Sequence, residues 1–188
     1  VPGPARAAGH GPGGGPGVGD TSAARLLMMP VGFLIQSSGR ISLAKAAEIQ
    51  AASGINKVKK FSFLLAIALF GSVLLYTVIL YIFYNPVSEI LGDKYKNISG
   101  YVFLWALYFA ANSIRYPLSN SLLACGMFRQ AALFDIISGT TTIISCIVLT
   151  KLYSGYGAIA AVAGGELLSC ILTVRMIIKC KEKNHAIL

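Results

Sequence analysis

A run of 24 residues without a charged side chain, at 61–84, limits what this chain can fold into more than any other feature. The run reads FSFLLAIALFGSVLLYTVILYIFY, and its polar members, such as Ser72, Tyr76 and Thr77, are only mildly polar. At about 1.5 Å per residue, a helix of this length rises roughly 36 Å, which is enough to cross a hydrocarbon core of about 30 Å. The run therefore predicts a membrane-spanning helix.

The composition extends this interpretation to the whole chain. Of 188 residues, 55% are hydrophobic and only 12% are charged, and the mean hydropathy is +0.69. This is too apolar for an ordinary water-soluble domain. We therefore predict an all-α, polytopic bundle of transmembrane helices, with four full spans at 61–84, 101–124, 131–150 and 157–178 and one partial or kinked span at 23–37, which contains Pro30.

The segments outside these spans are polar or small. Residues 1–21 are rich in glycine and proline and are predicted to be a disordered lead, whereas 22–178 form the helical lobe and 179–188 a basic tail. The segment 38–60 carries five basic residues and one acid, and its middle is expected to form a short surface helix that Gly54 closes.

The basic residues are distributed unequally between alternate loops. Nine lie in 38–60, at Arg129 and in the tail, whereas the opposite side has three. By the positive-inside rule, the richer side is cytoplasmic. We therefore expect an integral protein of the plasma membrane (the inner membrane of a bacterium), with the lipid bilayer as a partner and a cytoplasmic C-terminus. Topology then accounts for the net charge of +9, and we expect no nucleic-acid partner.

The span at 101–124 is unusual because Arg115 lies near its middle. An arginine at this depth costs about 2.5–3.5 kcal/mol on insertion scales, so it indicates a functional site. The alternative is an arginine neutralised by a carboxylate on the next helix, purely for packing. Helical spacing places it on one polar stripe, which consists of Tyr101, Trp105, Tyr108, Asn112, Arg115 and Ser119.

Two acidic residues lie in other spans. Glu166 is near the middle of its span, so it can meet Arg115, and a structural ion pair and a transport site are both open for it. Asp135 is about six residues from the centre of its span, roughly 9 Å toward the cytoplasm, where an interfacial cap or loop contact is favoured over a substrate role.

Catalytic and metal-binding groups are scarce in the spans. Both histidines, His10 and His185, lie outside every span, and the four cysteines show no CxxC spacing. No nucleophile, base and orienting group fall on one face. We therefore expect no enzyme activity, metal, cofactor or disulfide.

Four stretches together resemble a known family: SGRISLAKAAEIQAASGINKVKK, ILGDKY, NSLLACGMFRQAALFDIISGTT and YGAIAAVAGGELL. In this order and spacing they resemble the C-terminal lobe of the polysaccharide or oligosaccharide flippases, in the superfamily of the multidrug and toxin extrusion exporters. The resemblance covers residues 21–178. It implies one lobe of a two-lobed transporter, whose partner is an N-terminal lobe outside this chain, and a central cavity with Arg115 as a cation for a lipid-linked, pyrophosphate-bearing sugar.

The resemblance leads us to expect transport of a lipid-linked oligosaccharide or polysaccharide precursor by alternating access, for lipopolysaccharide or capsule export. One alternative is a multidrug exporter, in which Glu166 or Asp135 couples transport to protons or sodium. Another is a non-transporting membrane scaffold whose polar residues only join helices. The candidate substrate-binding residues are Arg115, Asn112, Ser119, Tyr108 and Glu166, and the coupling candidates are Asp135 and Glu166.

Overall fold

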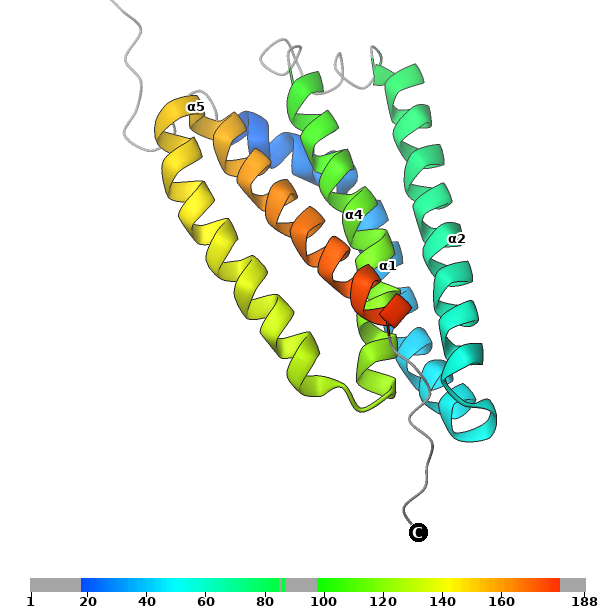
Figure 1. Cartoon of the computed structure of the whole chain (residues 1–188). Helices are drawn as coiled ribbons and strands as arrows, with labels where there is room; N and C mark the ends of the chain where they lie inside the picture. The colour runs from blue at the N-terminus through cyan, green and yellow to red at the C-terminus, as the bar shows by residue number, and fades with distance from the viewer. Residues whose placement is uncertain (1–17, 85, 87–97, 180–188) are drawn as a thin grey trace, which may run out of the picture.

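A computed structural model describes residues 18–84, 86 and 98–179, and its regular structure in this part is entirely helical. The prediction of an all-α fold is therefore confirmed for these residues. The lead at 1–17, most of the loop before residue 98 and the tail at 180–188 lie outside the described residues. The helices, shown in Figure 1, are α1 (Val18–Ser53), α2 (Ile55–Ile82), α4 (Ser99–Ala124) and α5 (Phe128–Lys179).

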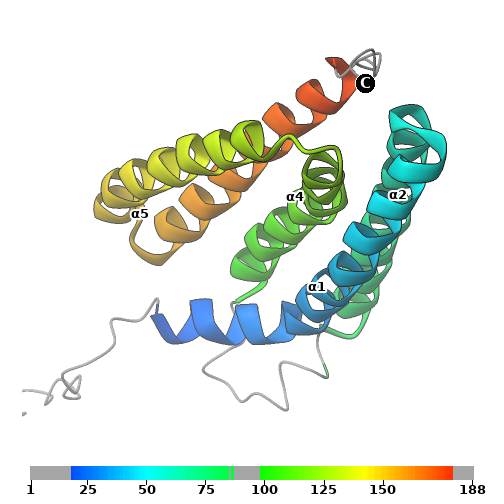
Figure 2. The ribbon, with the colours of Figure 1, turned by 90° about the horizontal axis from the view of Figure 1, so that it is seen from below.

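Helix α1 differs from the expectation. It begins at Val18, inside the predicted lead, and continues from the partial span at 23–37 to Ser53. The predicted helix at 42–53 is present, but it is not separate from the preceding span, because the charged and small residues at 38–53 are good helix formers and nothing stops the helix before Gly54. It ends where expected, at Gly54, whose φ of 76° favours glycine. Figure 2 shows α1 bent along its length, and Pro30 inside it accounts for the bend.

Helix α2 begins six residues earlier than the apolar run at 61–84 predicts, because the lysines that precede the run are also helical. Helix α5 folds back on itself and has two arms, as Figure 1 shows. The arms, 128–153 and 155–179, contain the predicted spans at 131–150 and 157–178. They meet at Ser154, which has non-helical backbone angles (φ 51°, ψ −130°).

Three helices, α1, α2 and α5, are long and apolar enough to cross a membrane. Their length and composition are compatible with membrane insertion. Helix α4 is not among the helices that are apolar enough, and its polar stripe includes Asn112 and Arg115. Many large hydrophobic side chains of α2 and of the first arm of α5 are exposed, as expected where lipid replaces water.

Helix α4 lies at the centre of the fold. It packs against α1, α2 and α5, whereas α1 and α5 barely touch each other. A buried cluster joins α1, α2 and α4 around Met28, Val73 and Trp105. No side chain in the first arm of α5 is buried, so this arm is the least embedded part of the described chain.

Small and polar residues allow α1 and α4 to approach closely near one end. The Asn120 side chain donates hydrogen bonds to the Gly39 carbonyl (3.0 Å) and to the Ser42 hydroxyl (2.9 Å). A Cβ atom at Gly39 would overlap the ring of Tyr116. Close contact between small residues, reinforced by interhelical hydrogen bonds, is how helices associate in membranes.

The turns after α1 and α4 lie at the bottom of Figure 1, and the second arm of α5 runs down toward this end. Lys57, Lys60, Arg129 and Lys179 lie in or next to these segments. Four of the nine basic residues that set the predicted topology therefore lie toward one end of the described fold.

Candidate functional site

Arg115 lies between two carboxylates, one from each arm of α5. Its Nε donates to Glu166 Oε1 at 2.6 Å, and its Nη1 donates to Asp135 Oδ1 at 3.1 Å. Asn112, one turn earlier on α4, donates from Nδ2 to the same Glu166 oxygen at 2.7 Å. These four side chains form a charged cluster, which we call the Arg115 cluster.

The two ion pairs have different surroundings. The side chains of Arg115 and Glu166 are only 19% and 11% exposed, whereas that of Asp135 is 64% exposed. An ion pair shielded from water interacts strongly but is costly to leave half-paired, whereas an exposed pair contributes little. The bond between Arg115 and Glu166 therefore dominates the cluster.

Close packing of the two arms of α5 positions both acids near Arg115. A Cβ atom at Gly165 would overlap the Thr142 hydroxyl, so only a glycine allows this approach. Thr142 keeps its hydroxyl bonded to the Ser138 carbonyl (2.8 Å). Glu166 follows Gly165 directly, so the tight contact between the arms also orients the carboxylate.

The structure brings together most of the predicted site residues. Arg115, Asn112 and Glu166 meet. The ion pair between Arg115 and Glu166 is one of the two arrangements that the sequence analysis left open for Glu166. Asp135 is a correction: its carboxylate binds Arg115, and not a helix cap or a loop as we expected. Ser119 is on the same stripe, but its hydroxyl makes no hydrogen bond to the described part of the chain and lies outside the cluster.

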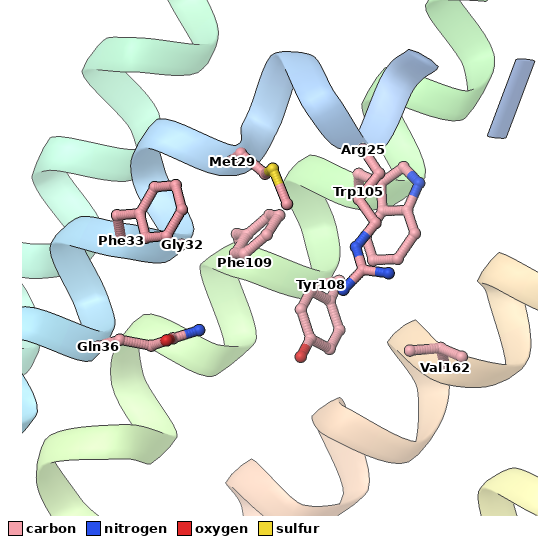
Figure 3. A pocket seen from close by; sticks show the side chains of 9 residues that line it. All are labelled: Arg25, Met29, Gly32, Phe33, Gln36, Trp105, Tyr108, Phe109 and Val162. Atoms are coloured by element: carbon pink, nitrogen blue, oxygen red, sulfur yellow. The ribbon is translucent and has the colours of Figure 1, made fainter. Parts of the chain in front are cut away.

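A pocket of about 340 Å³ lies beside the cluster, between α1, α4 and the second arm of α5. Figure 3 shows its walls, with Arg25 lying across the ring of Trp105 and Gln36 extending toward the same space from α1. Tyr108 lies between the two sites, because it lines the pocket and precedes Asn112 of the cluster by one turn of α4.

The pocket contains residues that the sequence reasoning missed. Arg25 lies over the Trp105 ring, 5.6 Å from its centre, and the Trp105 indole donates to the Thr21 carbonyl at 3.3 Å, which fixes the ring. The available signal was that Arg25 is the only charged residue of the apolar segment at 23–37. Tyr108 was predicted, but as part of a site around Arg115.

The residues that the structure describes offer no cluster of three or more His, Cys, Asp or Glu side chains for a metal ion. Arg115 engages both acids of its cluster. The arrangement therefore favours ion pairing and the binding of polar groups over metal chemistry in this part of the chain.

Long apolar helices around a shielded charge cluster define the class of this chain as a helical protein suited to a membrane. Comparison with known proteins found no family model that matches it and no significantly similar curated protein or solved structure.

Proposed function

We propose that this chain is one lobe of a membrane transporter that flips or exports a lipid-linked oligosaccharide or polysaccharide precursor by alternating access. The observation that carries the proposal is the Arg115 cluster, together with the pocket beside it, among helices apolar enough for a bilayer. Charged groups at membrane depth are costly and typically mark a substrate or ion pathway. The partner would be a second lobe, outside this chain.

In this proposal the polar stripe of α4 lines the path. Tyr108 faces the pocket, and Asn112 and Arg115 continue the stripe toward the opposite end of α4. Arg115 has five N–H donors, of which the two carboxylates engage two, so it can still bind phosphate oxygens. The membrane is the plasma membrane, and the end of the bundle with the basic residues, including the C-terminus, faces the cytoplasm.

A multidrug exporter is the second candidate, and the charge of the cluster favours it. Counted by formal charge, the cluster holds one arginine and two carboxylates, which leaves one negative charge in excess. A net negative site attracts protons or cations, so Glu166 and the more exposed Asp135 would serve as coupling carboxylates.

The proposal can be tested by translocation. The chain is tagged at its C-terminus, purified from its own cells with any partner lobe that accompanies it, and reconstituted in liposomes. A fluorescent polyprenyl-diphosphate sugar then reports translocation, because a membrane-impermeant reductant quenches only the outer leaflet. We expect faster translocation than in empty liposomes, and a slower rate for Arg115→Lys, which keeps the charge but loses the planar guanidinium.

Other results would decide against the flippase. Efflux of a cationic dye that is driven by a proton gradient, without translocation of the sugar lipid, would favour the exporter. If the purified protein moves neither molecule, transport is the wrong class, and the cluster serves to join helices in a scaffold.

A further inference from the structure

The pocket between α1, α4 and α5 differs from the Arg115 cluster because its cation has no acidic partner among the residues that the structure describes. Arg115 binds two carboxylates, whereas Arg25 makes no ion pair with any described residue. Among the described residues that line the pocket, Arg25 is the only charged one. The described walls of the pocket therefore offer one full positive charge and no carboxylate.

Two further polar side chains of the pocket are without internal partners. Neither the Tyr108 hydroxyl nor the Gln36 amide makes a hydrogen bond within the described chain, and both line the pocket with Arg25 (Figure 3). Polar groups in a bilayer normally find a partner, because lipid tails offer none. A guanidinium, an amide and a phenol around one space can together bind phosphate oxygens and hydroxyl groups.

The other walls of the pocket are apolar. Met29 and Phe109 line it between the polar groups, and Phe33 continues this surface on α1. Phe109 packs edge-on against Tyr108, with ring centres 5.1 Å apart. On the facing helix α1, Gly32 has no side chain and leaves room for the Phe109 ring. One side of the pocket thus suits an anion, and the other suits a hydrocarbon chain or the face of a sugar ring.

The size of the pocket restricts what enters it. Its volume of about 340 Å³ is near the lower limit of ligand pockets, which measure about 300–1,000 Å³. It can hold one end of an amphipathic molecule but not a complete oligosaccharide.

We propose that this pocket binds the phosphate-bearing end of an amphipathic lipid, with Arg25 contacting the phosphate, Gln36 and Tyr108 binding neighbouring oxygens, and Phe109 and Met29 contacting the apolar part. The inference rests on the proposed function, because it identifies the phosphate-bearing lipid as a lipid-linked sugar. It adds a second phosphate site to the one proposed at Arg115, because Arg25 is engaged by no carboxylate of the described residues, whereas Arg115 is engaged by two.

The pocket contains its own reporter. Trp105 is the only tryptophan of the chain, and the Arg25 guanidinium lies over its ring. A phosphate that draws Arg25 away from the ring will change the emission of Trp105. The whole chain in nanodiscs of zwitterionic phosphatidylcholine is titrated with farnesyl diphosphate, with farnesol as the uncharged control.

We expect a saturable change in emission with farnesyl diphosphate and none with farnesol. Because substitution of Arg25 also removes the group that acts on Trp105, binding by the Arg25 variants is measured as radiolabelled farnesyl diphosphate retained by the nanodiscs. Arg25→Gln should weaken this binding about tenfold or more, because it removes a charge-assisted hydrogen bond, and Arg25→Lys should weaken it less. Tyr108→Phe should weaken it by a smaller factor. Arg40→Gln, an exposed arginine of the same helix outside the pocket, is the matched control and should leave binding unchanged.

Several outcomes would overturn the inference. These are the absence of binding, equal binding of farnesol, and equal losses in Arg25→Gln and Arg40→Gln. Equally tight binding of inorganic pyrophosphate would mean that the pocket takes free phosphate. Competition by phosphatidylglycerol at equal concentration would mean that it takes a bilayer headgroup.

This assay is independent of transport. Binding through Arg25 without translocation of the sugar lipid would refute the proposed function and leave the pocket assigned. Translocation that Arg25→Gln does not affect, together with unchanged binding, would refute the pocket and leave the function.

Discussion

Replacing Arg115 with alanine should destabilise the fold, because Glu166 would remain shielded and lose its cation. The Glu166 side chain is only 11% exposed, and its bond to Arg115 is 2.6 Å long. Removing one partner of a buried ion pair costs about 3–5 kcal/mol. Asn112 would still donate to Glu166 at 2.7 Å, which places the expected loss at the lower end, about 3 kcal/mol. The unfolded fraction would then rise by about a hundredfold.

The two acids provide the controls. Because Asp135 is 64% exposed, Asp135→Asn should cost less than about 1 kcal/mol. Arg115→Ala combined with Glu166→Ala should recover much of the loss, since no unpaired charge remains, and the coupling energy should be about 1–3 kcal/mol.

Unfolding by sodium dodecyl sulfate in detergent micelles, followed by the emission of the single tryptophan, measures these differences. The reasoning fails if Arg115→Ala unfolds within about 0.5 kcal/mol of the parent, a change typical of a surface residue. It also fails if the double variant is no more stable than Arg115→Ala.

Three further predictions concern topology and backbone. In a variant without native cysteines, an impermeant thiol reagent added outside should label Lys151→Cys and spare Lys57→Cys; the reverse pattern refutes the orientation. Gly165→Ala should lower the free energy of unfolding by about 1–3 kcal/mol through overpacking. Gly139→Ala is the control, with nothing within 4 Å of the added carbon, and it should be neutral or stabilising. Equal losses in the two variants would contradict the close contact of the arms. Ser154→Gly should raise the melting temperature, because φ at this position is 51° and relief of such strain is worth about 1 kcal/mol; an unchanged value argues against strain.

The helical class followed from the sequence because an uncharged run such as 61–84 has few alternatives. The extent of the helices did not. The segment after 37 looked like a loop because it is charged, yet charged residues such as Lys45 and Glu48 also form good helices and pair with each other at 2.9 Å. Hydropathy thus located the apolar parts of the helices, whereas a backbone signal, Gly54, located a true end.

Half of the site could be predicted in the same way. Depth along two spans brought Arg115 and Glu166 together, because residues near the middle of neighbouring helices lie at similar heights. The same comparison of depths placed Asp135 away from Arg115 and Glu166. It was wrong because it does not include the length of the arginine side chain or the close contact of the two arms of α5. The pocket around Arg25 depends on how three helices far apart in the sequence pack, which no local pattern contains.

The length of α1 gives its bend a mechanical effect. From Pro30 to Ser53 the helix is continuous, and at 1.5 Å per residue this portion is about 35 Å long. A change of about 10° in the bend would move its far end by about 6 Å. Only Gly54 separates that end from α2, so such a displacement would act directly on the start of α2. Helix α1 can therefore act as a lever that carries a small movement at the level of the pocket to the end of the bundle where the basic residues gather.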